Sequence, residues 1–245
     1  ANTINVDLAN SATKKNETLM DTMQTLKAMQ INMFVIRHKE SGLPHRIASN
    51  IDGVAIINAG DGINAHPTQA LLDMLTIRQH KSSFDNLSVA IIGDIRHSRV
   101  AHSDIQALNI LGVKDIRLVA PANLQYDGQT PEGVSCFDNL QEGIDGVDVM
   151  MTLRLQKERM MSADIPNEQV YFETFGLTNK KLTLAKPDAI IMHPGPVNRG
   201  IELDSGVADG PQSVILQQVT NGIAVRMAVM MVLMMNHLLM MMTMT

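Results

Sequence analysis

The chain has 245 residues, of which 45% are hydrophobic and 18% are charged. This composition is typical of a soluble α/β protein large enough for one large core or two modest ones. The formal net charge of −5 excludes a general affinity for nucleic acid, which depends on a surplus of Lys and Arg. The single cysteine, Cys136, excludes an internal disulfide and a cysteine-based zinc site, and it fits a reducing cytoplasm.

The chain opens on a polar stretch that has neither an initiator Met nor the apolar core of a secretory signal. Ile4–Leu8 is typical of a strand that already lies inside a domain, so we expect a chain that lacks its N-terminal part. A helix is predicted over Glu17–Gln30, with Ser11 or Thr13 as its N-cap.

Short apolar runs then alternate with helical patterns, which predicts an α/β fold of parallel sheets flanked by helices. The predicted strands are Met33–Arg37, Ala55–Asn58, Ser88–Gly93, Ile116–Ala120, Val147–Thr152 and Ala189–His193, and a short strand is also expected around Cys136. The predicted helices are Pro67–Lys81, Val100–Leu111, which Gly112 would end, and Leu140–Ile144.

A polar break at Lys81–Asn86 divides the pattern into two lobes, residues 1–80 and 81–212, joined by the helix Pro67–Lys81. Residues 213–245 hold an amphipathic stretch, Ser213–Met235, that we expect to run back to the first lobe, and a Met-rich tail. Asn236 interrupts the apolar run and Arg226 precedes it, so no clean span of about twenty residues is expected for a membrane helix. A packing helix is favoured over membrane attachment.

Cationic and amide side chains follow the predicted strands, and open α/β sheets bind ligands at the carboxyl ends of their strands. Arg37 ends the first strand, Arg99 follows a Gly93–Asp94 turn, and Arg154 with Gln156 follows Thr152. The turn lacks a G-x-G-x-x-G pattern, so a dinucleotide site is not favoured. Because the guanidinium fork suits carboxylates, two such arginines would hold a dicarboxylate in one orientation.

Two further loops carry polar groups. In HPTQ, His66 and Gln69 stand at a predicted helix start, where free N–H groups and the positive end of the helix dipole favour an anion. In HPGPVNRG, two prolines rigidify a turn around Gly195 and expose carbonyls that accept from an amine. Each loop alone also fits a purely structural role. Together they predict a positively charged cleft between the lobes for small, oxygen-rich anions.

The motifs SATKKNETLMDT, NAGDGINAHPTQALLD, GDIRHSRVAHS, MTLRLQKERM and HPGPVNRG, in this order, resemble the catalytic chains of the aspartate carbamoyltransferase family, over residue 1 to about residue 230. Ornithine carbamoyltransferases share the HPTQ element but usually carry an HCLP turn and an SMG loop. The HPGP and RLQ sequences found here therefore favour an anionic second substrate.

The resemblance implies a two-lobed α/β fold whose first lobe is incomplete, and a reaction that needs no metal or organic cofactor. The carbamoyl group would pass from carbamoyl phosphate to the amine of L-aspartate, giving N-carbamoyl-L-aspartate and phosphate in pyrimidine biosynthesis. The resemblance assigns Arg37, His66 and Gln69 to catalysis, and these three residues with the backbone of Gly195 and Pro196 to carbamoyl phosphate. It assigns the carboxylates of aspartate to Lys15, Arg99, Arg154 and Gln156.

Ser11 and Lys15 match a loop that family members insert into the neighbouring subunit's site, so the resemblance also implies a cytoplasmic homotrimer with shared sites. Nucleic acid and membrane are not expected partners. A larger assembly with regulatory chains or a dihydroorotase-like partner stays open.

One family motif has no counterpart in this chain. The principal phosphate cradle of the family, a Ser-Thr-Arg-Thr-Arg turn, is absent from the sequence. We interpret the chain as a fragment of a longer product. Two alternatives stay open: a carbamoyltransferase with another amine acceptor, and a catalytically impaired fragment or assembly subunit.

Overall fold

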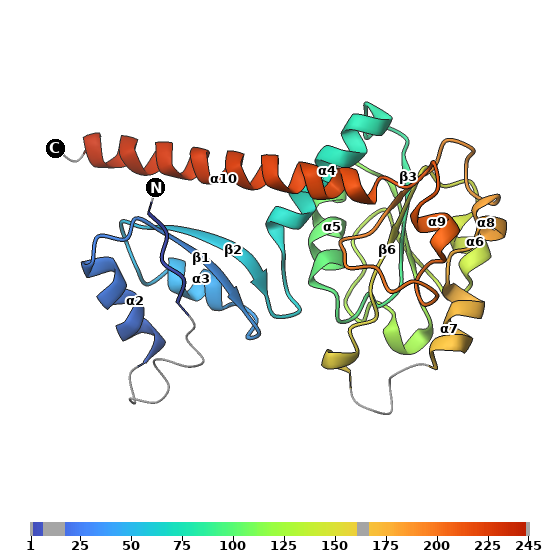
Figure 1. Ribbon diagram of the computed structural model, residues 1–245, viewed down its shortest axis with the longest axis horizontal. Helices are drawn as coiled ribbons and strands as arrows, with labels where there is room; N and C mark the ends of the chain where they lie inside the picture. Colours follow the sequence, from blue (N-terminus) through green and yellow to red (C-terminus); the bar gives the residue numbers. More distant parts are fainter. Residues whose placement is uncertain (1, 7–17, 161–166, 244–245) are drawn as a thin grey trace.

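The computed structural model describes residues 2–6, 18–160 and 167–243. Figure 1 shows two bodies, each built on a parallel sheet, with helix α4 between them and the long helix α10 running from one across the other. Residues 2–6 form no strand, so the prediction of a strand over Ile4–Leu8 was wrong for the part that is described.

The first body holds α2 (Leu19–Ala28), β1 (Met33–His38), α3 (Leu43–Ala48) and β2 (Ala55–Asp61). Strands β1 and β2 pair in parallel, and a small core packs beneath them, built from Met23, Phe34, Leu43, Ile47 and Ile51. The N-cap of α2 is Thr18, not Ser11 or Thr13. Thr18 and Asp21 bond to each other's backbone N–H groups, and the helix begins at this reciprocal capping box.

The second body is a sheet of five parallel strands in the order β5-β4-β3-β6-β7. The strands are β3 (Ser88–Ile92), β4 (Asp115–Val119), β5 (Val134–Phe137), β6 (Val149–Thr152) and β7 (Ile190–Met192). Helices α5 (Arg99–Ile110), α6 (Leu140–Ile144), α7 (Glu168–Phe175), α8 (Asn179–Leu182) and α9 (Ser205–Ala208) surround it, with the short turns η2 (Ala122–Leu124) and η3 (Lys157–Arg159).

The order of the strands creates a crevice in this sheet. From β3 the chain steps outward to β4 and β5, and it then crosses back to place β6 on the other side of β3. Loops that leave β3 and β6 therefore turn in opposite directions, and ligands bind open α/β sheets at such a point. The loops that carry Arg99 and Arg154 leave these two strands.

Helix α4 (Pro67–Lys81) begins and ends where the sequence pattern predicted. Helix α10 (Ile215–Thr243) packs along it and reaches β2. A polar seam joins the two helices: the amide of Asn221 donates to Thr76 and to Gln79, and that of Gln218 donates to Asp73. These buried bonds fix the register of the two helices.

Outside the seam, on both sides of it along the helix, α10 presents large apolar side chains to solvent, among them Leu216, Ile223, Met227 and Met231. By length and composition alone, Ile215–Asn236 is apolar enough to cross a membrane, with 22 residues at a mean hydropathy of 1.4. The expectation that no such span remains was therefore wrong, because Arg226 is a single charge within it and Asn236 lies at its end.

Candidate active site

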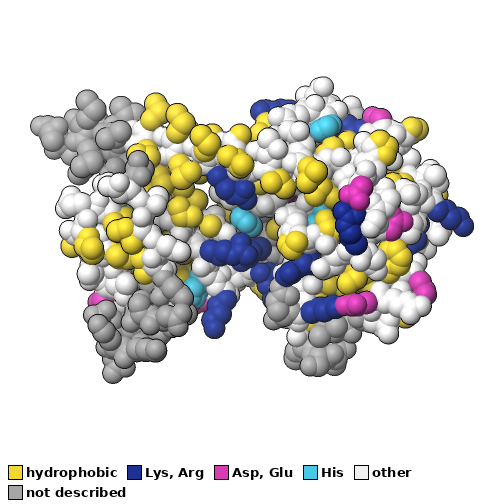
Figure 2. Space-filling view, in the orientation of Figure 1, with side chains coloured by type: hydrophobic (Ala, Val, Ile, Leu, Met, Phe, Trp, Pro, Cys, Tyr) yellow, Lys and Arg dark blue, Asp and Glu magenta, His cyan; other side chains and the backbone are white. Residues whose placement is uncertain are grey.

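Polar side chains gather in the hollow between the two bodies. Figure 2 shows Lys, Arg and His side chains clustered there, although the chain as a whole is acidic. Three of the loops that reach this region leave the carboxyl ends of β2, β3 and β6. The arrangement concentrates positive charge where a small anion would enter, which is the local steering expected of an anion site in a protein of net negative charge.

His66 is the N-cap residue of α4, and its side chain makes no capping bond. Its backbone N–H donates to the Oγ atom of Ser103 on α5, at 2.8 Å, so the first turn of α4 is tied to the second body. Burial first, and then the positive charges of Arg99, Arg37 and Arg226, lower the pKa of His66 to about 4. The imidazole is therefore neutral at physiological pH and acts as a hydrogen-bonding group.

Arg99 is the first residue of α5, and only 8% of it is exposed. Its guanidinium lies against the backbone of Gly60 and donates to the carbonyl of Gly62 at 3.3 Å. Burial, followed by the charges of Arg37 and Arg159, lowers its pKa to about 10. The lowered pKa shows that the charged form of Arg99 is destabilised by burial and by neighbouring cations. A bound anion would stabilise that charged form.

The loop after β6 carries Arg154 and Gln156. The amide of Gln156 points back to the carbonyl of Arg154 at 3.5 Å, and its backbone N–H donates to Asp94. Asp94 is fully buried and also accepts from the backbone and the ring of His97. Asp94 thus ties the loop after β3 to the loop after β6, across the crevice of the sheet.

The loop after β7 carries Gly195 and Pro196, which are joined by a cis peptide bond. The N–H of Gly195 donates to Nδ1 of His193 at 2.8 Å. Burial, and then the charge of Arg154, lowers the pKa of His193 to about 4. Arg154 therefore lies close to the base of this loop. Among the described residues, Nε2 of His193 has no hydrogen-bond partner.

Glu202 links the loops after β6 and β7. Its carboxylate accepts from the backbone of Leu155 and from both the backbone and the side chain of Asn198. It is almost fully buried, and burial raises its pKa. Sequence patterns offered no signal for this role, because Glu202 lies outside every motif and its partners come from two separate loops.

Gln69 does not reach freely into the hollow. It is buried, and its Nε2 donates to both oxygens of Asp73, one helical turn along α4, at 3.1 and 3.2 Å. Asp73 also accepts from Gln218 at 2.7 Å, and the Oε1 atom of Gln218 accepts from the backbone of His193. A chain of hydrogen bonds therefore runs from the start of α4 to the base of the loop after β7.

The structure thus groups Arg37, His66 and Arg99, and it places Arg154 and Gln156 beside the loop of Gly195 and Pro196. Ser11 and Lys15 lie outside the described residues. The sequence patterns did not indicate that Ser103 and Arg226 lie close to His66. Only the helical spacing of Ser103 from Arg99 could have indicated that it faces the same side of α5.

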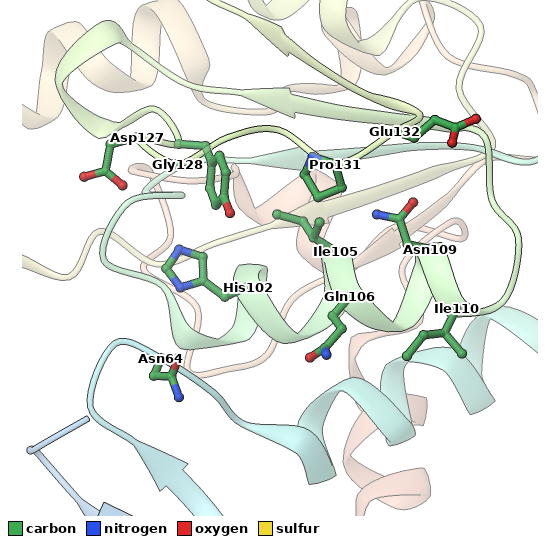
Figure 3. Close-up of a pocket in the computed structure, with 11 residues that line it drawn as sticks. Asn64, His102, Ile105, Gln106, Asn109, Ile110, Asp127, Gly128, Pro131 and Glu132 are labelled. Atoms are coloured by element: carbon green, nitrogen blue, oxygen red, sulfur yellow. The ribbon is translucent and has the colours of Figure 1, made fainter. Parts of the chain in front are cut away.

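A cavity of about 660 Å³ lies beside α5, and its lining, shown in Figure 3, includes none of the predicted site residues. His102, Gln106 and Asn109 line it from the helix, and Asp127 and Glu132 line it from the loop opposite. Its described lining holds two carboxylates and neither Lys nor Arg, so it does not suit an anion. Within the described residues, no group of three His, Cys, Asp or Glu side chains is placed to hold a metal.

Two domain families match the sequence. Residues 1–79 match the carbamoyl-P binding domain of aspartate/ornithine carbamoyltransferases, and residues 85–233 match their Asp/Orn binding domain. The chain is 70% identical, over 95% of its length and 73% of the relative's, to the aspartate carbamoyltransferase catalytic subunit of Vesicomyosocius okutanii subsp. Calyptogena okutanii.

Two solved structures are also similar. The aspartate transcarbamoylase of Trypanosoma cruzi in complex with carbamoyl phosphate and aspartate has a TM-score of 0.78 and 32% identity, over 93% of this chain and 74% of that one. The ornithine carbamoyltransferase of Thermus thermophilus has a TM-score of 0.81 over 93% and 75% of the two chains. At 22% identity, the second likeness concerns the fold alone.

Proposed function

The chain belongs to the aspartate/ornithine carbamoyltransferase family, and we propose that it is an aspartate carbamoyltransferase of pyrimidine biosynthesis. It would transfer the carbamoyl group of carbamoyl phosphate to the amine of L-aspartate, giving N-carbamoyl-L-aspartate and phosphate. The observation that carries this proposal is the cluster of Arg37, Arg99 and Arg226 around a neutral His66, at the crevice where the two bodies meet. Two small anionic substrates would offset the mutual repulsion of these cations.

Residues 1–80 would hold carbamoyl phosphate, residues 81–212 would hold aspartate, and residues 213–245 would return to the first lobe. Arg37 and His66 would donate to the carbonyl oxygen of the carbamoyl group. A neutral imidazole serves this role, because its N–H stabilises the negative charge that develops on that oxygen as the amine attacks. The carbonyl groups around Gly195 and Pro196 would accept from the attacking amine, and the Oε1 atom of Gln69 would accept from the carbamoyl amide.

Arg99, Arg154 and Gln156 would bind the two carboxylates of aspartate. Alignment of the two anions in one site is worth up to roughly 7–11 kcal/mol of the activation barrier. None of the described side chains is an evident base for the aspartate amine, so the departing phosphate would take its proton. No metal or organic cofactor is part of this mechanism.

We also propose a cytoplasmic homotrimer in which Ser11 and Lys15 of one subunit complete the site of the next, with Lys15 reaching aspartate. The single exposed cysteine is compatible with the cytoplasm. Helix α10 exposes large apolar side chains, among them Ile223, Met227 and Met231, and an exposed apolar patch is typical of a protein–protein contact.

Titration calorimetry of the 245-residue chain with carbamoyl phosphate, followed by transfer assays, tests this function. Binding heat and turnover with aspartate support it. Binding heat with turnover only for ornithine, N-acetylornithine or putrescine would identify a different acceptor. The absence of any binding heat would instead support the second candidate, an impaired fragment or assembly subunit.

A further inference from the structure

The loop that follows β6, Leu153–Gln156, presents alternate side chains to opposite sides. Leu153 and Leu155 are buried in the second body, whereas Arg154 and Gln156 are partly exposed. This is the alternation of an extended chain, in which successive side chains point to opposite faces. A shift of this segment by one residue would therefore bury the two side chains that would bind aspartate.

Two buried carboxylates hold this loop by its backbone. The N–H of Leu155 donates to Oε1 of Glu202 at 3.3 Å, and the N–H of Gln156 donates to Oδ2 of Asp94 at 3.2 Å. Asp94 follows β3 and Glu202 follows β7, so two consecutive peptide groups are bound from two different segments of the chain. Bonds to the backbone do not depend on the side chains of the loop, and together they oppose its rotation.

Glu202 is itself held in place by its surroundings. The N–H of Leu177, between α7 and α8, donates to the backbone carbonyl of Glu202 at 2.9 Å, and the neighbouring Leu203 is fully buried. Asn198 binds the carboxylate twice: its backbone N–H donates to Oε2 at 2.9 Å, and its Nδ2 donates to Oε1 at 2.8 Å. Together with the N–H of Leu155, these donors favour the charged form of Glu202, against the burial that raises its pKa.

Asn198 belongs to the loop after β7, which also carries Gly195 and Pro196. The carboxylate of Glu202 therefore joins this loop to the loop after β6. We propose that Glu202 is a positioning residue for the transfer reaction, and that it sets the separation of these two loops. The inference rests on the proposed function, in which the two loops bind opposite ends of one aspartate molecule: its carboxylates at the loop after β6 and its amine at the loop after β7.

A fixed separation matters because aspartate is short, with its amine and its carboxylates only a few bonds apart. A misplacement of about 1 Å can cost roughly 10²-fold in rate. Loss of the bond from Leu155 to Glu202 would free the loop after β6 and leave the first body untouched. The binding of aspartate should then weaken more than that of carbamoyl phosphate, which Arg37, His66 and Gln69 of the first body would hold.

Two substitutions separate the hydrogen bond from the charge. Glu202→Ala removes both, whereas Glu202→Gln removes the charge and keeps one acceptor oxygen. Oε1 accepts from two donors and Oε2 from one, so the amide oxygen should take the place of Oε1 and stay bonded to Leu155. The NH2 group then faces the backbone N–H of Asn198, which loses its acceptor. Exposed Glu142→Gln is the matched control.

Amide hydrogen exchange, followed by NMR of the full chain, tests the contact without any turnover. Glu202→Ala should accelerate exchange at Leu155 about tenfold or more relative to Gln156, whose own acceptor is retained. Glu202→Gln should accelerate exchange at Asn198 and leave Leu155 protected, and Glu142→Gln should change neither. Wild-type exchange at Leu155 in Glu202→Ala would overturn the proposal. If the alanine variant does not fold, unchanged protection at both Leu155 and Asn198 in Glu202→Gln would overturn it.

Steady-state kinetics test the consequence for the site. In Glu202→Ala the KM for aspartate should rise about tenfold or more, while the KM for carbamoyl phosphate should rise less. Glu202→Gln lacks the same charge but keeps the bond to Leu155, so it should restore most of the KM for aspartate.

Equal KM values for aspartate in the two variants would refute the positioning role. So would a fall in kcat with both KM values unchanged, which is the result of a smaller folded fraction. Absence of turnover in the wild type would count against the proposed function, and the exchange measurement would still decide whether Glu202 holds the loop after β6.

Discussion

The backbone N–H of His66 lies 2.8 Å from the Oγ atom of Ser103, to which it donates a hydrogen bond. This bond crosses from the first body to a helix of the second. It holds the first turn of α4 beside Arg99, which is four residues before Ser103 on the same helix. The position of the imidazole is therefore set by the backbone, independently of the ring itself.

Because the backbone is held by Ser103, His66→Ala should remove the imidazole without moving the loop. We expect kcat to fall by about 10²–10³, the usual cost of losing one donor to a developing oxyanion. Steady-state kinetics measure this, with exposed His45→Ala as the control that should retain wild-type kcat. Unchanged turnover in His66→Ala would remove the ring from the chemistry.

Arg154→Ala should act mainly on the binding of the second substrate. A charged hydrogen bond contributes roughly 1.5–3 kcal/mol, so the KM for aspartate should rise roughly 10- to 150-fold while kcat changes less. The matched control is Arg46→Ala, which removes an exposed arginine paired with Glu40. If kcat fell and KM stayed constant, Arg154 would belong to the reacting centre instead.

Gly60 has a positive φ of 136°, and a Cβ atom there would lie 2.9 Å from the Cζ and Nη1 atoms of Arg99. Gly60→Ala should therefore displace the buried guanidinium and raise the KM for aspartate. Gly53 also has a positive φ, of 68°, but a Cβ atom there meets nothing within 4 Å. Both alanine variants should lose about 1 kcal/mol or more of stability in urea denaturation, but only Gly60→Ala should bind substrate more weakly. Equal KM values in the two variants would exclude the contact with Arg99 as the cause.

His193 should make folding sensitive to acid. Its pKa is lowered to about 4 in the folded chain, against about 6.5 when unfolded, so the unfolded chain binds more protons between these values. The unfolding free energy of the wild type, relative to His193→Asn, should therefore rise with pH by up to about 1.4 kcal/mol per unit from pH 4 to pH 6.5 and level off above. Burial raises the pKa of Asp73 and of Asp104, and the titration of these groups changes the unfolding free energy in the opposite direction. The difference between variants must therefore be measured, with exposed His80→Asn as control. A flat difference would show that His193 is not held neutral by burial.

Most elements followed from local patterns. Helix α4 was predicted at its observed bounds because Pro67 opens it after a non-helical residue, and the five strands of the second sheet were located to within about two residues. Helices α3, α7, α8 and α9 were missed, since four to eight residues show little of the helical period, although α6, with five residues, was predicted at its observed bounds. The cap at Thr18 was missed because Ser11 and Thr13 are equally good capping residues by type.

The residues of the candidate site could likewise be predicted in part from local sequence patterns. Arg37, His66, Arg99, Arg154 and Gln156 could be selected from the sequence because each follows a strand or begins a helix, and those positions are readable along the chain. Gln69 could be selected for the same reason, but its bond to Asp73 could not be foreseen. The pairing of an amide with a buried carboxylate depends on which face of α4 is covered, and α10 covers it from about 145 residues away.

The alternation of strands and helices, and the cations and amides that follow the strands, could be recognised along the chain. Periodicity of two or 3.6 residues is a local property, so a chain carries it before it folds. Other features follow only from packing: β6 lies next to β3, Asp94 and Glu202 connect three loops, and Asp73 and Asp104 are each fully buried. These depend on which surfaces bury each other, and burial is a property of the whole packed chain.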